Sequence, residues 1–212
     1  MTLNELSQIF AGICLVLSIL LFGRRLRAFN QLVRLVDRAN PKGIVKTGIF
    51  YAYTLGMAPW SKESTRLHML SYLRGVAFHV GIFLGLGIFL ASPWIPLLTS
   101  SIRLVLAAVA GMGAVFGMIG FFARFLEASL KSLSTTDDFF SVLLVSLFLA
   151  VTAYWLVTPA AQSVYFLVGG VMLLYAPFSK IRHCIYFAYS RWFYGKFIGS
   201  RAVLPHSQQV VR

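Results

Sequence analysis

Residues 71–90 read SYLRGVAFHVGIFLGLGIFL, an apolar run that contains one arginine, Arg74, and one histidine, His79. A helix needs about 20 apolar residues to cross the roughly 30 Å hydrocarbon core of a bilayer. This run has that length, and its apolar residues are continuous rather than alternating, which favours a membrane helix over a barrel strand. An imidazole inside such a helix is costly unless the protein uses it.

Four further blocks have the same character, and we predict an all-α membrane protein, a five-transmembrane-helix bundle that forms one membrane domain over residues 1–212. Only 12% of the residues are charged and the mean hydropathy is +0.79, whereas a soluble domain carries about 25% charged residues. The blocks are Leu6–Phe22, Gly75–Ala91, Leu104–Phe122, Phe139–Val157 and Val164–Phe178. We expect the fifth helix to continue, so that this span covers about residues 164–185. The first block has no basic residue before it and GRRLR after it, which is typical of a retained anchor.

The basic residues predict the orientation of the chain. Of the 19 Lys and Arg residues, 17 fall in segments that the five spans place on one side: residues 24–70, the loop between the third and fourth spans, and the tail. Basic residues concentrate on the cytoplasmic side of membrane proteins. We therefore expect the N-terminus outside, a basic cytoplasmic loop over 24–70, and a basic cytoplasmic tail over 186–212.

The same distribution explains the formal net charge of +13. No nucleic-acid motif accompanies the charge, so we expect no nucleic-acid partner. Basic residues at a membrane surface contact anionic lipid of the bilayer. They also suit docking of an acidic cytosolic partner, and both interpretations stay open. The two cysteines, Cys14 and Cys184, are far apart in sequence and predict neither a disulfide framework nor a CxxC metal site.

Two of the four histidines, His79 and His183, fall near the same predicted inner edge of the membrane. His79 lies about 7 Å inside the edge that Arg74 marks, at 1.5 Å per helical residue. His183 lies at the inner end of the fifth span, in the stretch APFSKIRHCIYFAYSRWFYGKF (176–197). Two imidazoles on antiparallel helices at similar depth suit one iron held between them.

Residues around the two histidines form a candidate haem environment. Gly75, one turn before His79, has no side chain and would let a flat macrocycle approach the helix backbone. Tyr72 and His68 return to the same face of the helix on its cytoplasmic side. Arg191 lies on the cytoplasmic side of the fifth helix. We take Gly75, Tyr72, His68 and Arg191 as candidates for contact with the cofactor.

Geometry alone leaves three interpretations open: a bis-histidine haem, a structural pair of hydrogen-bonding histidines, and a path for protons or substrate. The spans contain almost no carboxylates, because Glu127 lies at an end and Asp137 and Asp138 open the fourth span. Ion-coupled transport usually needs a carboxylate at depth, so this scarcity argues against a transporter. In GMGAVFGMIG (111–120), Gly113 and Gly117 have GxxxG spacing, which we interpret as helix packing.

Three stretches carry a resemblance to a known family: FHVGIF (78–83), STTDDFFSVLLV (134–145) and residues 176–197. With the five-span layout, they resemble the cytochrome b family of the respiratory nitrate reductase gamma subunit. That family includes related membrane subunits of the Dsr, Hmc and Tmc complexes and of heterodisulfide reductase. The resemblance covers roughly residues 60–200 and implies a five-helix cytochrome b that interacts with quinone.

The resemblance implies that His79 and His183 are the axial ligands of the haem nearest the cytoplasm. The ligands of the family's second haem correspond to Phe89 and Tyr165 here, and phenylalanine cannot ligate iron. We therefore expect one haem b. His206 follows a stretch with Gly and Pro, and we do not expect it to form a second haem site with His68.

From these residues the sequence predicts a haem b-containing subunit of a respiratory redox complex in the prokaryotic cytoplasmic (inner) membrane. It would transfer electrons between menaquinone or ubiquinone and a cytoplasmic or membrane-associated iron–sulfur subunit. The chain has no cysteine cluster, flavin loop or phosphate-binding loop, so we expect it to catalyse no reaction alone. The alternative is a membrane anchor or assembly subunit of such a complex without a cofactor.

Overall fold

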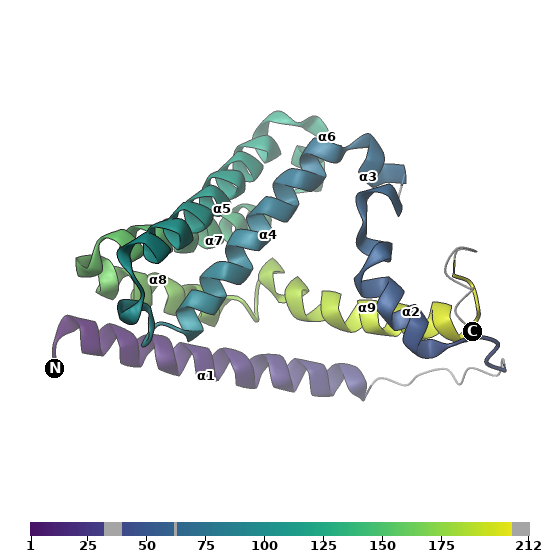
Figure 1. Cartoon of the computed structure of the whole chain (residues 1–212), viewed down its shortest axis with the longest axis horizontal. Helices are drawn as coiled ribbons and strands as arrows, with labels where there is room; N and C mark the ends of the chain where they lie inside the picture. Colours follow the sequence, from purple (N-terminus) through teal and green to yellow (C-terminus); the bar gives the residue numbers. More distant parts are fainter. Residues whose placement is uncertain (32–39, 62, 205–212) are drawn as a thin grey trace. The chain divides into compact units, whose positions relative to one another are not determined.

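The computed structural model describes residues 1–31, 40–61 and 63–204, which form α-helices and short 3₁₀ turns and contain no strand (Figure 1). Four helices are long and apolar enough to cross a membrane: α1 (Leu3–Asn30), α4 (Met69–Leu90), α5 (Ser100–Leu126) and α7 (Thr136–Val157). A fifth crossing is counted if Pro159–Tyr175 and Lys180–Ser200 form one broken span. The predicted all-α, multi-pass membrane protein in a lipid bilayer is therefore confirmed.

The described residues group into two compact units, where the sequence predicts a single domain. Unit 1 comprises Met1–Arg24 and Leu70–Ile181, and unit 2 comprises Arg25–Met69 and Arg182–Arg212. The shorter helices α6 (Ala128–Leu133) and α8 (Gln162–Tyr175) belong to unit 1. Unit 2 contains α2 (Val45–Tyr53), α3 (Glu63–Leu67) and α9 (His183–Ser200).

Small residues let the helices of unit 1 approach each other closely. Helix α4 meets α5 where Gly81 faces Gly113, and a Cβ on either glycine would lie within 2.9 Å of the other's Cα. A Cβ on Gly117 would collide with Ser146 of α7 and Phe78 of α4. Membrane helices use small residues at such interfaces because lipid gives little hydrophobic drive for association. The interpretation of Gly113 and Gly117 as packing residues is confirmed.

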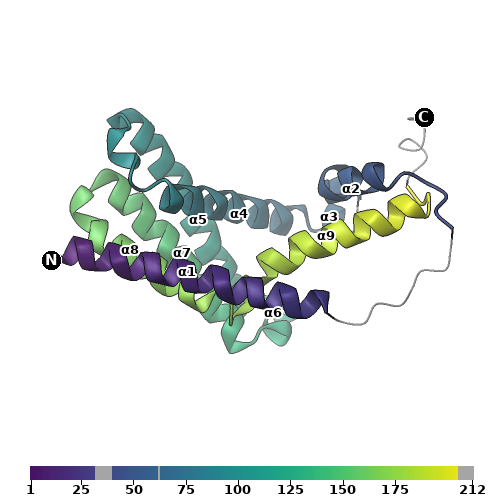
Figure 2. The same cartoon turned by 90° about the horizontal axis from the view of Figure 1, so that it is seen from below.

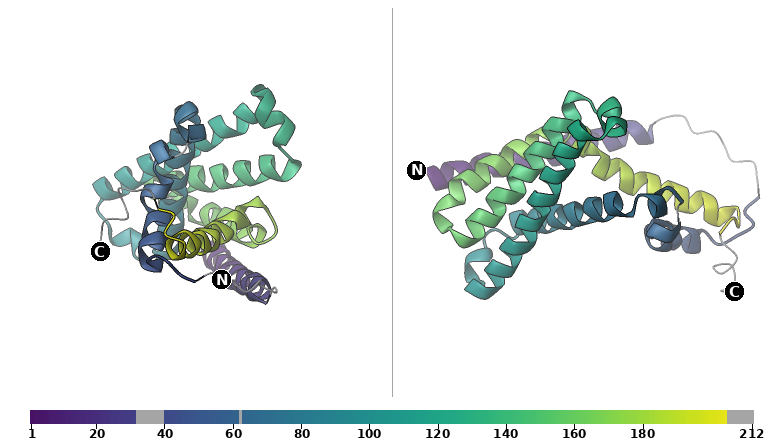
Figure 3. Two further views of the ribbon diagram at one scale, coloured as in Figure 1. Left: turned by 90° about the vertical axis from the view of Figure 1, so that its right-hand side faces the viewer. Right: turned by 90° about the horizontal axis from the view of Figure 1, so that it is seen from above.

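Helix α7 forms the centre of unit 1. It lies beside α5, to which α6 connects it, and it also contacts α8 (Figures 1 and 3). Phe148 and Leu149 of α7 are fully buried. Helix α1 packs on α8 at Gly170, where a Cβ would lie 2.7 Å from the Phe10 ring (Figure 2). The buried residues of α1 are all small: Ser7, Ala11, Cys14 and Ser18.

The predicted fifth span, residues 164–185, is not one continuous helix. Helix α8 ends at Tyr175, the chain turns through residues 176–179, and the 3₁₀ turn η5 (Lys180–Arg182) leads into α9. Pro177 has no N–H for a helical hydrogen bond, and a proline ring conflicts with the carbonyl of the preceding turn. The 14 residues of α8 span about 21 Å, less than the roughly 30 Å of a hydrocarbon core.

Unit 2 is helical where the sequence predicts a loop and a tail. Helices α2 and α9 lie side by side (Figures 1 and 2). A Cβ on Gly48 would lie 2.5 Å from Gly199 Cα, and a Cβ on Gly195 would lie 2.6 Å from Ile49 Cα. The predicted tail is therefore a packed helix as far as Ser200. Residues 32–39, 62 and 205–212 of the predicted loop and tail lie outside the described residues.

The contact of Gly81 with Gly113 leads to a test with a matched control on the same helix. Gly81→Ala should destabilise the protein by about 1–3 kcal/mol, because the added methyl group meets backbone. Gly87→Ala should cause no loss, because a Cβ at Gly87 meets nothing within 4 Å among the described residues. Thermal unfolding of each detergent-purified variant, followed by circular dichroism, measures the difference. Equal melting temperatures for the two variants would contradict the close approach.

Candidate functional site

His79 lies on α4 and contacts the backbone of its own helix. Its Nδ1 is 2.7 Å from the carbonyl oxygen of Gly75. The imidazole is exposed within unit 1, and its ring centroid lies 6.1 Å from that of Phe78 and 6.5 Å from that of Phe83. Because a carbonyl can only accept, Nδ1 is the protonated nitrogen in this contact, and Nε2 then carries the lone pair. The Gly75 carbonyl thus fixes both the tautomer and the direction of the ring.

The face of α4 beside His79 is open at Gly75. A Cβ built there meets nothing within 4 Å among the described residues. Histidine ligands of metals usually have one ring nitrogen oriented by a carbonyl, a carboxylate or water, as Nδ1 of His79 is by Gly75 O. The space at Gly75 leaves room for a flat group against the backbone. The role of His79 as an axial ligand, and that of Gly75 as a neighbour of the cofactor, stay predictions.

The other candidates on α4 lie toward its start. Tyr72 is half-buried one turn before Gly75. Arg74 Nη1 lies 3.7 Å from Glu127 Oε1, at the end of α5. This contact directs the Arg74 guanidinium to a carboxylate of its own unit.

The remaining candidates, His183, His68 and Arg191, belong to unit 2. His183 is the first residue of α9 and is exposed. His68 is exposed in the turn between α3 and α4, with its N–H donating to Thr65 O at 3.3 Å. The Arg191 guanidinium lies 5.2 Å from the centroid of the Phe187 ring. His206 lies outside the described residues.

The two predicted iron ligands thus come from different compact units, His79 from unit 1 and His183 from unit 2. Pairing of His79 with His183 on one iron stays a prediction. Among the described residues, no group of three or more His, Cys, Asp or Glu side chains is placed to hold a metal ion. A pair of axial histidines is a site of a different kind, because a porphyrin supplies the other iron ligands.

The positions that correspond to the family's second haem lie in the core of unit 1. The ring centroids of Phe89 and Tyr165 are 5.9 Å apart, and the Trp155 ring stacks on Tyr165 at 4.3 Å with an interplanar angle of 12°. The Tyr165 side chain is fully buried, and its hydroxyl has no hydrogen-bond partner among the described residues. Aromatic packing occupies the space between these two positions.

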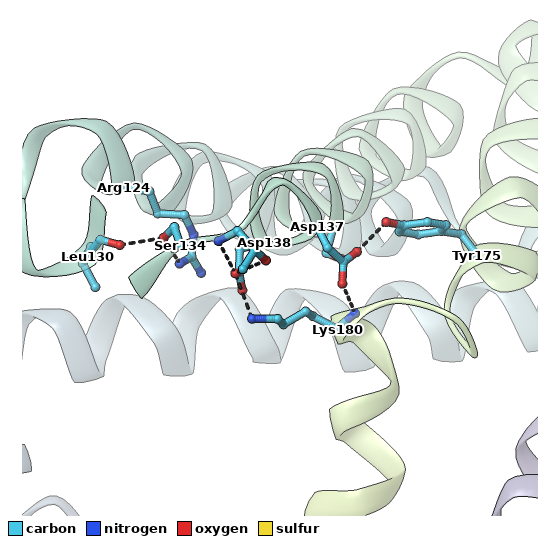
Figure 4. Close-up of polar contacts among 9 residues, drawn as sticks. Arg124, Leu130, Ser134, Asp137, Asp138, Tyr175 and Lys180 are labelled. Carbon is cyan, nitrogen blue, oxygen red and sulfur yellow. Dashed lines mark hydrogen bonds and ion pairs between the residues drawn. The ribbon is translucent and has the colours of Figure 1, made fainter. Parts of the chain in front are cut away.

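A polar cluster lies at the start of α7 (Figure 4). The half-buried Asp137 carboxylate accepts from the Tyr175 hydroxyl, from the Lys180 backbone N–H at 2.8 Å and from the Ser141 hydroxyl at 3.2 Å. Asp138 Oδ2 accepts from Lys180 Nζ at 2.9 Å. These contacts attach the turn after α8 to the start of α7.

Asp138 also caps α7. Its Oδ2 accepts from the Thr135 N–H at 2.8 Å and from the Thr135 hydroxyl at 2.7 Å. The first of these bonds and the Asp138 N–H, which donates to the Thr135 side chain, form a capping box. Nearby, Arg124 Nη1 donates to the Ser134 hydroxyl at 3.2 Å, and Ser134 donates to Leu130 O (Figure 4). From the sequence, Asp137 and Asp138 are predicted only to open the fourth span. The Thr-x-x-Asp pattern at 135–138 was a readable signal for the cap, whereas the partners Tyr175 and Lys180 had none.

The contacts of the polar cluster hold the turn after α8 against the start of α7. Its effect is to hold Lys180 in place three residues before His183. A structural role is therefore the simplest account of both carboxylates.

No protein-family model matches this chain, and neither a curated protein nor a solved structure matches it. The resemblance to the nitrate reductase gamma family stays a prediction.

Removing the Asp137 carboxylate should release the turn between α8 and α9. Asp137→Ala should destabilise the protein by about 1–3 kcal/mol, because the Lys180 N–H and the Tyr175 hydroxyl lose their acceptor. Limited digestion with trypsin, analysed by mass spectrometry, should show faster cleavage after Lys180. Glu127→Ala is the control, since its ion pair is long and 46% of the Glu127 side chain is exposed; we expect a loss below about 1 kcal/mol. Unchanged cleavage in Asp137→Ala would show that the Asp137 hydrogen bonds do not hold the turn after α8.

Proposed function

We propose that this chain is a haem b-containing membrane subunit of a respiratory redox complex, with His79 and His183 as the axial ligands of one haem. The observation that carries the proposal is the Gly75–His79 contact of 2.7 Å on an open face of α4. The resemblance of residues 78–83, 134–145 and 176–197 to the nitrate reductase gamma family supports the same residues. The membrane helices supply the setting that a subunit of this kind requires.

The chain's own residues would orient and enclose the cofactor. The Gly75 carbonyl holds the His79 imidazole in one tautomer and one orientation. The absence of a side chain at Gly75 leaves the helix backbone accessible beside the ligand. When bound, a haem with two histidine ligands supplies one-electron transfer rather than oxygen binding. Tyr72, His68 and Arg191 are the proposed neighbours of the cofactor.

The proposed partners follow from charge and from the resemblance. The positive-inside rule supports an external N-terminus and a cytoplasmic C-terminus, in a prokaryotic cytoplasmic (inner) membrane. A cytoplasmic-side iron–sulfur subunit would exchange electrons with the haem, and menaquinone or ubiquinone would be the membrane-side partner. Basic residues of unit 2 would face that iron–sulfur subunit.

Absorption spectroscopy of the purified protein tests the proposal directly. The wild-type protein should show a reduced-minus-oxidised b-type band, and the pyridine haemochrome assay should give one haem per chain. His79→Ala and His183→Ala should each abolish the band, because each removes one axial ligand. His206→Ala should retain it. A full spectrum in either His79→Ala or His183→Ala would overturn the ligand assignment. A colourless wild-type protein would favour the alternative function, a membrane anchor or assembly subunit without a cofactor.

Gly75→Leu distinguishes a cofactor ligand from a purely structural histidine. The leucine enters space that is open among the described residues, so the fold should be retained, but it would cover the face of α4 beside His79. We expect haem content to fall at least about tenfold while the melting temperature of the apoprotein changes little. Gly87→Leu, also at an open position of α4, is the matched control and should keep its haem. Full haem content in Gly75→Leu would show that Gly75 does not lie beside the haem.

A further inference from the structure

A basic pocket lies at the C-terminal end of α9, within unit 2. It has a volume of about 370 Å³ and is lined by Asn40, Lys42, Phe197, Arg201 and Val203. This volume falls in the range of small-molecule sites, roughly 300–1,000 Å³. The Lys42 side chain is exposed, and the Arg201 guanidinium lies 5.3 Å from the centroid of the Phe197 ring. The lining therefore combines two cations, one amide and two apolar side chains.

The carbonyls at the C-terminal end of α9 accept backbone hydrogen bonds, which reduces their repulsion of an anion. A helix C-terminus carries partial negative charge on carbonyls that lack partners. Here Ser200 O accepts from the Lys42 N–H at 2.8 Å and from the Gly43 N–H at 3.2 Å. The last turns are closed by Val203 N–H donating to Ile198 O and Ala202 N–H donating to Gly199 O, at 3.2 and 3.3 Å.

These two bonds form a Schellman motif, with Ala202 in the left-handed region at φ 54°. The motif turns the chain so that Val203 lines the same pocket as Arg201. The packing of α2 on α9 places Lys42 there as well, because Lys42 immediately precedes Gly43, whose Cβ would lie 3.0 Å from Ala202 Cα. Lys42 and Arg201 are far apart in sequence, and the fold brings them together in one pocket.

The composition of unit 2 fits a membrane surface. Its described residues carry nine Lys and Arg side chains against one carboxylate, Glu63. Trp and Tyr concentrate at membrane–water interfaces, and basic residues bind anionic headgroups there. Many aromatic side chains of unit 2 are exposed: Phe50, Tyr53, Trp60, Phe187, Trp192, Phe193, Tyr194 and Phe197. Two of the basic residues of α9 lie over aromatic rings of the same helix, Arg191 over Phe187 and Lys196 over Trp192.

We propose that this pocket binds the phosphate group of an anionic membrane phospholipid. Lys42 and Arg201 pair with the phosphate, Asn40 hydrogen-bonds the headgroup, and Phe197 and Val203 contact the glycerol and the first methylenes of the acyl chains. A lipid matches this lining better than a free anion does, because two of the five side chains are apolar. An acidic protein surface would meet the same cations but would not enter a pocket of this size. The site is independent of haem binding.

Native mass spectrometry of the full chain in a neutral detergent tests this site. Phosphatidylglycerol is titrated into the wild-type protein, with phosphatidylcholine as the zwitterionic lipid and inorganic phosphate as the free anion. We expect one phosphatidylglycerol adduct that resists delipidation, and binding at least about tenfold tighter than phosphatidylcholine. The double variant Lys42→Gln, Arg201→Gln should weaken phosphatidylglycerol binding roughly 10- to 30-fold, at about 1 kcal/mol per cation.

Lys46→Gln, Lys196→Gln is the matched control, because it removes the same charge from α2 and α9 outside the pocket. It should bind phosphatidylglycerol like the wild type, and Lys42→Gln alone, at an exposed side chain, should give an intermediate loss in a folded protein. Equal loss in the control would indicate diffuse charge attraction and overturn the site. So would equal affinity for phosphatidylcholine, displacement by millimolar inorganic phosphate, or preferential capture of a polyglutamate peptide.

Discussion

Close backbone contact between helices is the constraint on which both units depend. In lipid, helices gain little from burying apolar side chains against each other, so association relies on van der Waals contact at short range. Gly81 and Gly113 provide it between α4 and α5, and Gly48, Gly195 and Gly199 provide it between α2 and α9. Each contact excludes even a methyl group. The absence of side chains at a few positions therefore sets how closely these helices approach.

This packing also distinguishes two faces of α4, one that contacts other helices and one that carries Gly75. Gly81 and Gly85 point into the bundle, where Gly113, Phe148 and Leu149 meet them. Gly75 meets nothing among the described residues, and the neighbouring His79 is exposed. The glycines of α4 therefore differ in their surroundings. Gly81 and Gly85 allow close helix packing, whereas Gly75 leaves a face of the helix uncovered.

The sequence predicted the helices that are long and uniformly apolar, because length and hydropathy suffice there. The contact of His79 with the Gly75 carbonyl is an i−4 bond within one helix and is therefore local. The break at Pro177 was readable but missed, because apolar residues continue on both sides of it. Two partners of Asp137, Tyr175 and Lys180, lie 38 and 43 residues away, and no local pattern indicates them. Gly48, Gly195 and Gly199 fall within the predicted basic loop and tail.

The positions of the basic residues in the sequence predict the orientation in the membrane, but only the fold shows which of them lie together. The 17 basic residues on one predicted side support an orientation, and that argument needs only their number and their place in the sequence. It treats Lys42 and Lys46 alike. The fold separates them: Lys42 lines a pocket with Arg201, and Lys46 does not. A bilayer surface attracts both residues through its average potential, whereas a single phosphate can pair only with cations that converge on it. Specific recognition of a lipid thus requires the contact between α2 and α9, and so depends on the same glycines that hold unit 2 together.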